Sequence, residues 1–484
     1  MLFSLSTCPG FVVDAGMMAI SAKAKLTALM IVALLAGCST GPDYRAPSEA
    51  SLGIPSEYAR SNGKALDDRQ LAQWWTQFGD PVLEGLVSKA IAGNLDIVQA
   101  RARLVQAREA AVQAGAAYLP TVSANADGGR NFRSPGTDSS SFSVGVNASW
   151  ELDLFGGVGR SVEAARAEAR GVEYDLASVR VAIIAETVTN YIQVRLAQDQ
   201  IRIARETLAI QNDNLQIAHW RVMAGLASSL DEEQARTQRA QTAASIPSLE
   251  QAYRGGLARL AVLTGQAPGE ATRALESEGP IPMAPATIAV GIPADTLRQR
   301  PDVRAAERTL AAQTARIGVA KTALLPALRI SGNIGTNALR LGNLGDLVTG
   351  GLFAGLSQLI FDGGATASRV RAQRAAVDGA FAAYRKSVIS SLEDIENGLV
   401  AIDATAERSR QSAIALDAAS NSAILARIQY RSGLTDFRTL LDAERLLLSS
   451  RNSEAASRAD RALAMVQLYR ALGGGWQTME GTTR

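Results

Sequence analysis

The chain has 484 residues and a formal net charge of +2, with 49 basic and 47 acidic side chains. Because the two signs are interspersed, no basic face for nucleic acid is predicted and no nucleic-acid partner is expected. One histidine and two cysteines, Cys8 and Cys38, are too few for a disulfide framework, a histidine metal site or a catalytic triad. Neither a metal nor any other non-covalent cofactor is expected.

The motifs of common enzyme active sites are also missing. There is no phosphate-binding loop of the form Gly-x4-Gly-Lys and no Gly-x-Ser-x-Gly turn, and the acidic residues lie on predicted helix faces without converging. We therefore expect no catalytic site and no enzymatic activity.

Residues 1–37 are predicted to be a signal peptide. Two lysines precede ten apolar residues, 26–35, a run that is too short to cross a bilayer as a helix but suits a secretory signal. Asp14 interrupts the apolar residues before them. Met17 or Met18 is therefore a better start for such a signal than the first residue.

Cys38 follows Leu-Ala-Gly and resembles the cysteine of a bacterial lipoprotein box, which takes a diacylglycerol on its sulfur and becomes the new N-terminus. Ser39 follows it, whereas an aspartate there would resemble an inner-membrane retention signal, so the outer membrane is favoured. Covalent lipid contributes ~0.8 kcal/mol per buried methylene, enough for anchoring by several chains. The alternative is a plain secretory signal in which the cysteine is incidental.

Residues 38–80 are predicted to be an extended, lipid-bearing segment, because they begin with a polar stretch that contains three prolines. A helix is predicted to start at Pro81. Asp80 is a good N-cap, and proline suits the first helical turn. This helix is expected to continue to about Tyr118 and to stop before Pro120.

Two segments, 121–131 and 142–154, change to the period of two that is typical of β-strands. In the second segment, apolar residues from Phe142 to Leu154 alternate with serine, glycine, asparagine and acidic residues. The polar residues 132–141 between the segments predict an exposed loop. Together they predict a β-hairpin.

A helix of unusual length is predicted over residues 157–224, which contain no proline. At ~1.5 Å per residue it would be about 100 Å long. Its apolar residues recur at alternating steps of three and four, the repeat of a coiled coil. They are Val162, Ala165, Ala169, Val172, Leu176, Val179 and Ile183. The helix therefore needs partner helices beside it.

A turn at Gly225 and Leu226 is predicted to send the chain back along this helix. The returning helix is expected over Ser229–Leu263, with residues 229–232 as a capping box at its start. Residues 266–292 are rich in glycine and proline and are predicted to be a connector.

The pattern then repeats, which predicts two copies of one unit: repeat 1 over residues 81–265 and repeat 2 over 293–475, with a tail at 476–484. The second copy supplies two more alternating segments, 327–337 and 352–361, and a second long helix over 364–432. Corresponding pairs are Pro120 with Pro326, Phe155 with Phe361, Gly225 with Gly433 and Gly265 with Gly473.

These elements predict an internally duplicated α+β membrane protein. Strands of ~9 to 11 tilted residues span an outer membrane, but four strands per chain cannot close a barrel, and open edges are not tolerated in lipid. Several copies must therefore share one barrel, and the long helices would continue it into the periplasm as a ring of coiled coils. The alternative is a small soluble sheet that caps a periplasmic coiled coil.

Several motifs together resemble the TolC-like outer-membrane efflux factors, in their lipoprotein (NodT/OprM-like) branch. The resemblance covers the mature chain and implies a homotrimer with a 12-stranded barrel and an α-helical periplasmic tunnel. It also implies a periplasmic adaptor protein and an inner-membrane pump of the resistance-nodulation-division class as partners. The motifs are Gly41-Pro42-Asp43-Tyr44 after Cys38-Ser39, Trp74-Trp75 before Phe78-Gly79-Asp80-Pro81, Arg300-Pro301-Asp302-Val303-Arg304 before Ala306-Glu307, Leu440-Leu441-Asp442-Ala443, and Leu472-Gly473-Gly474-Gly475-Trp476.

The resemblance implies the outer-membrane channel of a tripartite efflux system that conducts drugs or other toxic compounds to the exterior. A conduit for a type I protein secretion system would use the same tunnel, but the lipoprotein box and the glycine-rich ending resemble the efflux branch. A passive envelope spacer without a lumen is the third hypothesis.

In this family the turns between the long and the returning helices form the inner end of the tunnel and meet the adaptor. The corresponding residues are Gly225 and Leu226 at the first turn and Gly433 and Leu434 at the second. They are the predicted docking tips.

The family's aperture residues match Tyr430 and Asp442. Three copies of one carboxylate around a narrow axis would favour cations. Asp442 could instead pair with Arg438 or Arg445 on its own helix. Some relatives carry an apolar residue or a second acid where this chain has Arg438 and Thr439, so the way in which the aperture closes is left open.

Two further features have simpler explanations. His219, next to Trp220, could serve adaptor binding or pH sensing, but a solvated helix position is favoured. The arginines at 369, 371 and 374 are interpreted as a solvated helix face.

Overall fold

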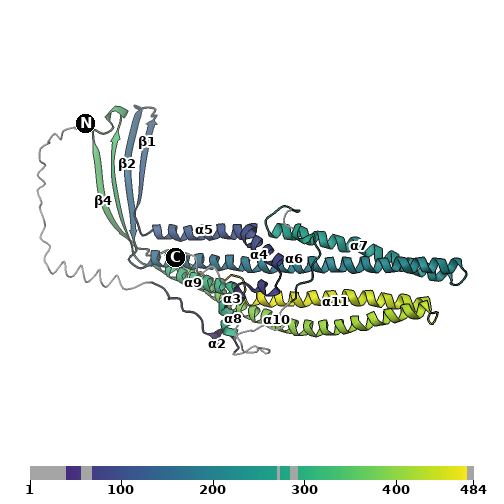
Figure 1. Cartoon of the computed structure of the whole chain (residues 1–484). Coiled ribbons are helices and arrows are strands. Elements are labelled where there is room, and N and C mark those ends of the chain that lie inside the picture. Colours follow the sequence, from purple (N-terminus) through teal and green to yellow (C-terminus); the bar gives the residue numbers. More distant parts are fainter. Residues whose placement is uncertain (1–39, 56–67, 270–272, 284–292, 477–484) are drawn as a thin grey trace, which may run out of the picture. The chain divides into compact units, whose positions relative to one another are not determined.

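The computed structural model describes residues 40–55, 68–269, 273–283 and 293–476 (Figure 1). The predicted signal peptide and Cys38 lie outside these residues, as does the predicted tail after Trp476. The chain divides into two compact units. Of the described residues, the sheet unit comprises 40–42, 115–161 and 316–371, and the helical unit comprises 43–55, 68–114, 162–269, 273–283, 293–315 and 372–476.

The sheet unit contains one antiparallel sheet in the order β1-β2-β3-β4. Its strands are β1 (Thr121–Asn131), β2 (Ser139–Leu152), β3 (Ala327–Ala338) and β4 (Val348–Ser357). The prediction for the last strand, 352–361, was wrong by four residues. Ala327 lies opposite Ser357, and Pro326, which lacks an N–H group, precedes β3. Residues after Ser357 therefore have no strand to pair with.

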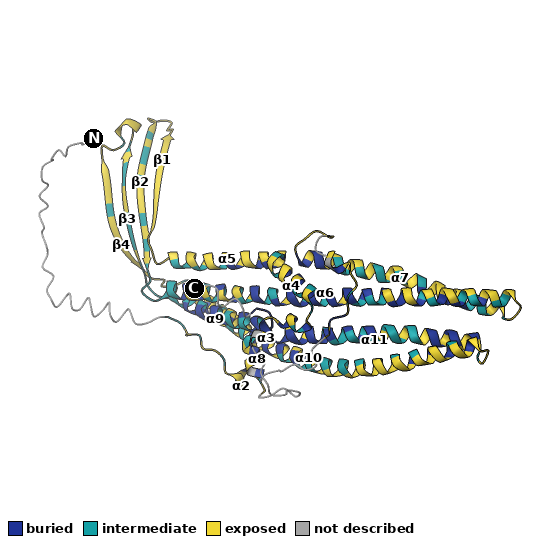
Figure 2. Ribbon diagram, viewed as in Figure 1, coloured by how far each residue is buried: buried dark blue, intermediate teal, exposed yellow. Residues whose placement is uncertain are grey.

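The register of the sheet places apolar residues opposite one another on a single face. Val146 of β2 lies between Ala124 of β1 and Ile334 of β3, and Leu328 lies between Leu152 and Leu356. The other face is mostly serine, threonine, asparagine and glycine, with an ion pair between Arg329 and Glu151 at 3.3 Å. Figure 2 shows the strands exposed or half-buried throughout. Both faces therefore lack a covering layer within the described residues.

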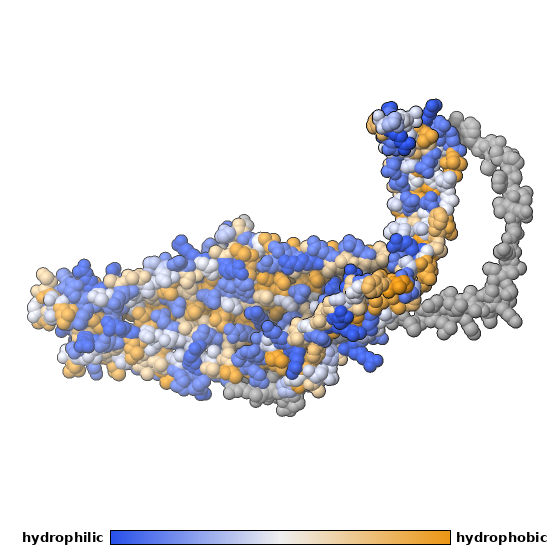
Figure 3. Space-filling view, turned by 180° about the vertical axis from the view of Figure 1, so that it is seen from behind, coloured by the Kyte–Doolittle hydropathy of each residue, from blue (hydrophilic) through white to orange (hydrophobic). Residues whose placement is uncertain are grey.

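The helical unit is built on two antiparallel helix pairs, visible side by side in Figure 1. They are α6 (Gly157–Met223) with α7 (Ser229–Leu263), and α10 (Ala365–Arg431) with α11 (Phe437–Ala471). Both long helices were predicted from their periodicity. Val162, Ala169, Leu176 and Ile183 of the predicted seam are buried, whereas hydrophilic and hydrophobic residues intermix over the surface (Figure 3).

Two helix boundaries differ from the prediction. The first predicted helix is divided into α4 (Pro81–Gly93) and α5 (Leu95–Ala116). Asn94 separates them because its side-chain oxygen accepts hydrogen bonds from the backbone amides of Asp96 and Ile97, at 2.9 and 3.1 Å, and so caps α5. At the start of α7, the capping residue is Ser228, whose hydroxyl accepts from Leu230 N, rather than Ser229.

The segment predicted as extended, 38–80, contains short helices where the structure describes it. They are α2 (Glu49–Leu52), α3 (Asp68–Ala72) and the 3-10 turn η1 (Trp74–Phe78). The connector, 266–292, includes the 3-10 turn η2 (Arg273–Leu275), and Leu275 and Ile281 are buried. α8 (Pro293–Gln299) and α9 (Pro301–Thr322) begin the second repeat. Apolar residues in both segments explain why they pack rather than extend.

The largest apolar cluster of the helical unit forms around Trp74. Its indole is stacked on the ring of Tyr469, with centroids 5.1 Å apart and an interplanar angle of 13°. The Tyr469 hydroxyl donates to Gln77 Oε1 at 2.7 Å, and burial raises the pKa of Tyr469 to about 12. Trp476 donates from Nε1 to the carbonyl of Gln299 at 3.0 Å. Tyr469 of α11 thus completes the core around Trp74, whereas Trp476 packs in a smaller cluster with Ala177 and Val181.

No helix within the described ranges combines the length and the apolar character needed to cross a membrane. The groups of histidine, cysteine, aspartate and glutamate in the same ranges also include none that could hold a metal ion.

Replacing Trp74 by alanine is expected to destabilise the helical unit by about 3–5 kcal/mol, because it leaves a cavity beside Tyr469. The measurement is thermal unfolding of the purified protein followed by circular dichroism at 222 nm. Trp220→Ala is the matched control, since the Trp220 side chain is 60% exposed. Equal melting temperatures for the two variants would contradict this account of the core.

Candidate functional site

The first candidate tip is the turn between α6 and α7. Gly225 has φ +69°, a left-handed conformation that glycine adopts without strain. Leu226 N donates to the carbonyl of Arg221 at 2.8 Å, which satisfies one of the last carbonyls of α6. Gly433 at the turn between α10 and α11 has φ +70°, and Leu434 makes the equivalent hydrogen bond. The duplication therefore extends to the hydrogen bonds of the two turns.

Large apolar side chains surround these turns without cover in a single chain. Leu226 and Leu434 are 72% and 79% exposed, and Trp220, Met223 and Leu230 are exposed as well. Exposed apolar side chains that gather in one place are typical of protein-binding surfaces. Both turns therefore carry uncovered apolar side chains in the described chain.

Tyr430, a predicted aperture residue, is buried near the second tip. Its ring lies 5.3 Å from that of Phe437, and the guanidinium carbon of Arg221 lies 4.7 Å from its centroid. This cation–π contact joins α6 to α10. In a single chain Tyr430 therefore holds two helices together, and a direct place in the aperture stays a prediction.

A buried carboxylate, Glu444 of α11, lies in the same region and was missed from the sequence. Arg427 Nη2 of α10 lies 3.1 Å from Glu444 Oε1, and Asn214 Nδ2 of α6 donates to Oε2 at 2.6 Å. Glu444 is only 4% exposed, so removing its partners would leave a buried charge, which is strongly destabilising. Three helices thus meet at one side chain.

Asp442 makes both of the ion pairs that its spacing allows. Arg445 Nη1 lies 3.3 Å and Arg438 Nε 3.9 Å from its two carboxylate oxygens. All three side chains are more than half exposed, and exposed pairs of this kind contribute only ~0–1 kcal/mol. The pairing leaves Asp442 and Arg438 accessible. It does not test their predicted role in the aperture.

His219 is exposed, as expected, but it is also paired. Its Nδ1 lies 2.9 Å from Glu232 Oε1, so the contact joins α6 to α7 one turn before the first tip. The arginines at 369, 371 and 374 are exposed, as expected for a solvated face.

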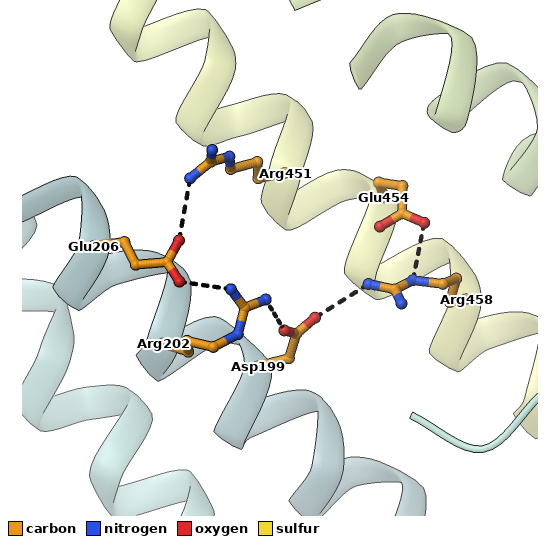
Figure 4. A network of polar contacts seen from close by, with 6 residues as sticks. All are labelled: Asp199, Arg202, Glu206, Arg451, Glu454 and Arg458. Carbon is orange, nitrogen blue, oxygen red and sulfur yellow. Dashed lines mark hydrogen bonds and ion pairs between the residues drawn. The ribbon is translucent and has the colours of Figure 1, made fainter. Parts of the chain in front are cut away.

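A network of six charged side chains joins α6 to α11 farther from the tips (Figure 4). Arg458 Nη2 lies 3.2 Å from Asp199 Oδ2, and Arg451 Nη1 lies 3.4 Å from Glu206 Oε2. The other members are Arg202, which binds both acids of α6, and Glu454, which binds Arg458. The network holds a long helix of the first repeat to a helix of the second. Its members alternate in charge along each helix, but the sequence could not show that the two helices are neighbours.

Comparison of the sequence and the structure with known proteins identifies the family of this chain. The family model described as outer membrane efflux protein matches residues 86–266 and 292–474. The chain belongs to the outer membrane efflux protein family. Its resemblance to the NodT/OprM-like branch is thereby confirmed, as is its interpretation as an outer-membrane efflux channel with an α+β fold.

Relatives of this efflux protein match over nearly their whole length. The pyoverdine export outer membrane protein OpmQ of Pseudomonas aeruginosa is 32% identical over 461 residues, which cover 92% of this chain and 95% of OpmQ. Nodulation protein T of Rhizobium leguminosarum bv. viciae is 30% identical over 457 residues, covering 93% and 94%.

Solved structures share the fold of this efflux protein. The outer-membrane channel OprN has a TM-score of 0.82 at 35% identity, covering 91% of this chain and 100% of OprN. The Campylobacter jejuni outer membrane channel CmeC reaches a TM-score of 0.81 at 22% identity, covering 91% and 95%. The family is one of channels and transport components, and the outer membrane is the location of this member.

The N-cap of α11 at the second tip is predicted to be sensitive to acid. Asp436 Oδ1 accepts from Thr439 N at 2.8 Å, and hydrogen bonds from Thr439 lower the pKa of Asp436 below its usual value. A carboxylate with a lowered folded-state pKa stabilises the helix start at neutral pH, and this stabilisation is lost as the pH falls through that lowered pKa.

Hydrogen exchange measures the effect. Protection of the first-turn amides of α11, relative to their intrinsic exchange rates, is expected to fall below about pH 4, near the usual aspartate pKa. Asp436→Asn keeps an acceptor but does not titrate, so its protection should stay constant over the same range. Identical pH profiles for the two proteins would contradict this role of Asp436.

Proposed function

We propose that this efflux channel is the outer-membrane component of a tripartite system that carries small toxic molecules to the exterior. A periplasmic adaptor and an inner-membrane pump of the resistance-nodulation-division class would deliver them. The single observation that supports a conduit most strongly is the sheet, which has one apolar face, one polar face and two open edges. Lipid would meet the apolar face and the transported molecules the polar one.

The assembly follows from the sheet edges. The outer edges of β1 and β4 have no neighbouring strand in the described chain. Each unpaired backbone group costs several kcal/mol in lipid, so β4 of one copy must pair with β1 of the next. A homotrimer with 12 strands in the outer-membrane lipid is the proposed closed form, as the family resemblance implies.

Each predicted segment of the chain has a proposed role. Residues 1–37 direct export and are removed, and Cys38 then carries the lipid at the head of the segment 38–80. The repeats, 81–265 and 293–475, supply the barrel and tunnel wall, with 266–292 as their connector and 476–484 as a tail. The lipoprotein box and the duplication of the two helix turns support these assignments.

The tips are the proposed docking surface for the adaptor. The exposed apolar side chains of Leu226 and Leu434, each beside a left-handed glycine at 225 or 433, support this role. They are held in place by hydrogen bonds to their own helices, so no ordering of the turn is needed when the adaptor binds.

The aperture is proposed to lie at Asp442 and Arg438, with Tyr430 acting on its width through Arg221. Their exposed side chains on one helix face support the assignment of the two charged residues. The contacts of Tyr430, on α10, with Arg221 of α6 and Phe437 of α11 would set how far these helices can separate.

The transported class is proposed to be small molecules rather than proteins, because the relative OpmQ is named for the export of pyoverdine. Deletion of the gene is expected to lower the minimum inhibitory concentrations of several dyes, detergents or antibiotics, and the wild-type gene should restore them. The proteins of the culture medium should stay unchanged. Loss of a secreted protein with unchanged susceptibility would instead favour a type I secretion conduit.

Replacement of Asp442 by alanine is expected to raise single-channel conductance in planar bilayers and to weaken block by divalent cations, because a ring of three carboxylates would be removed. Asp460→Ala is the matched control, since Asp460 is an exposed, arginine-paired acid elsewhere on α11. Unchanged conductance in Asp442→Ala would remove this residue from the aperture.

A further inference from the structure

The connection between β3 and β4, residues 339–347, carries four leucines. Leu339, Leu341 and Leu347 are 64–74% exposed, and Leu344 is half-buried. The loop is built around a 3-10 turn, η3 (Leu341–Asn343), and Gly345 N donates to Thr336 Oγ1 at 3.2 Å. Figure 1 shows this turn at the same end of the sheet as the β1–β2 connection.

The β1–β2 connection at that end, residues 132–138, is different in character. Phe132 is its only large apolar residue, and the side chain of Arg130 lies over that ring, 5.4 Å from the centroid. Arg130 also forms an ion pair with Asp138 at 3.3 Å. Phe132 is nonetheless 78% exposed, so this loop carries one exposed large apolar side chain, whereas residues 339–347 carry three.

The length of the apolar face argues that lipid does not cover the leucines. On β3 the apolar-face positions run from Leu328 to Ala338, six positions that span ten residues. At ~3.4 Å per residue and a tilt of about 40°, they span roughly 26 Å, which already fills the ~25 Å apolar band of an outer-membrane barrel. Residues 339–347 come after this band.

The alternation of side chains along β3 and β4 predicts that Leu339 and Leu347 lie on the side of the polar face. Asn333 and Asn337 of β3 and Thr349 of β4 lie on the polar face. Leu339 directly follows β3 and Leu347 directly precedes β4, two residues from Asn337 and Thr349. Extending the alternation by one residue at each strand end would place both leucines on the polar-face side. In a closed barrel that face lines the lumen.

The dimensions allow the loops of three copies to meet. Twelve strands spaced ~4.8 Å apart and tilted by about 40° give a backbone radius of roughly 12 Å. A nine-residue loop folded back on itself reaches at most about 15 Å, and the 3-10 turn shortens it somewhat. Its reach is therefore comparable with the distance to the barrel axis.

We propose that the leucine loops of three copies contact one another over the outer mouth of the barrel and form an apolar cap. Each exposed loop is thus covered by the same loop of another copy. The contact lies next to the edge of β4, where the copies join. The cap restricts exit by excluding water from the mouth, as apolar constrictions do in other channels. This inference rests on the trimeric barrel proposed above.

Thiol labelling of intact cells tests the cap. Asn333→Cys places a thiol on the polar face below the mouth, and it is treated with a small and with a polymer-linked maleimide. Changing the four leucines to serine is expected to raise the rate of labelling by the polymer reagent roughly tenfold, because an apolar constriction is removed. The rate with the small reagent should rise less, because a small molecule crosses an apolar constriction more readily than a polymer.

Thr137→Cys, in the polar β1–β2 loop, is the matched control and should label equally in both backgrounds. An unchanged polymer rate at Asn333→Cys would overturn the cap. Loss of the quadruple variant from the outer membrane would also overturn the cap, since the leucines would then contact lipid. Drug susceptibility of cells carrying Asn333→Cys alone reports separately on the proposed efflux function.

Discussion

Unpaired backbone groups on the outer edges of β1 and β4 are the constraint on which the rest of the molecule depends. In water, the unpaired backbone groups of an isolated four-stranded sheet can form hydrogen bonds with the solvent. In lipid no such partner is available, so a sheet whose apolar face contacts lipid must have its edge groups paired. The register aligns apolar residues across all four strands, so the face that requires lipid is continuous. Closure by further copies, as proposed above, would satisfy both demands.

The helical unit meets a different demand, that of holding helices many turns long in register. Heptad-spaced residues of α6 supply a seam of small apolar side chains. Polar contacts then fix which helices are neighbours: the ion network joins α6 to α11, and Glu444 joins both to α10. Buried polar contacts contribute specificity more than stability, because any displaced register would leave a charge without its partner.

Periodicity and turn residues were sufficient to predict most of the architecture. The long helices, the first hairpin and both turns at Gly225 and Gly433 were predicted from local patterns. The position of β4 was not, because its pairing stops opposite Ala327, the first residue of β3 after Pro326, and this constraint comes from another strand. The division at Asn94 was missed because a single amide both ends α4 and caps α5.

The candidate site was less accessible to sequence reasoning. Spacing on one helix showed the pairs of Asp442, whereas the contacts of Tyr430 with Arg221 and of Glu444 with Asn214 join residues more than two hundred positions apart. In the same way, the partners of Trp74 and Gln77 in the core come from the last helix, and Gln77 and Tyr469 are separated by 392 positions. For a protein threaded across the inner membrane from its N-terminus, this core cannot close until translocation is nearly finished. A chain that ends before α11 would leave the Trp74 indole without the ring on which it stacks, so early and late parts of the chain must both be present before this core can form.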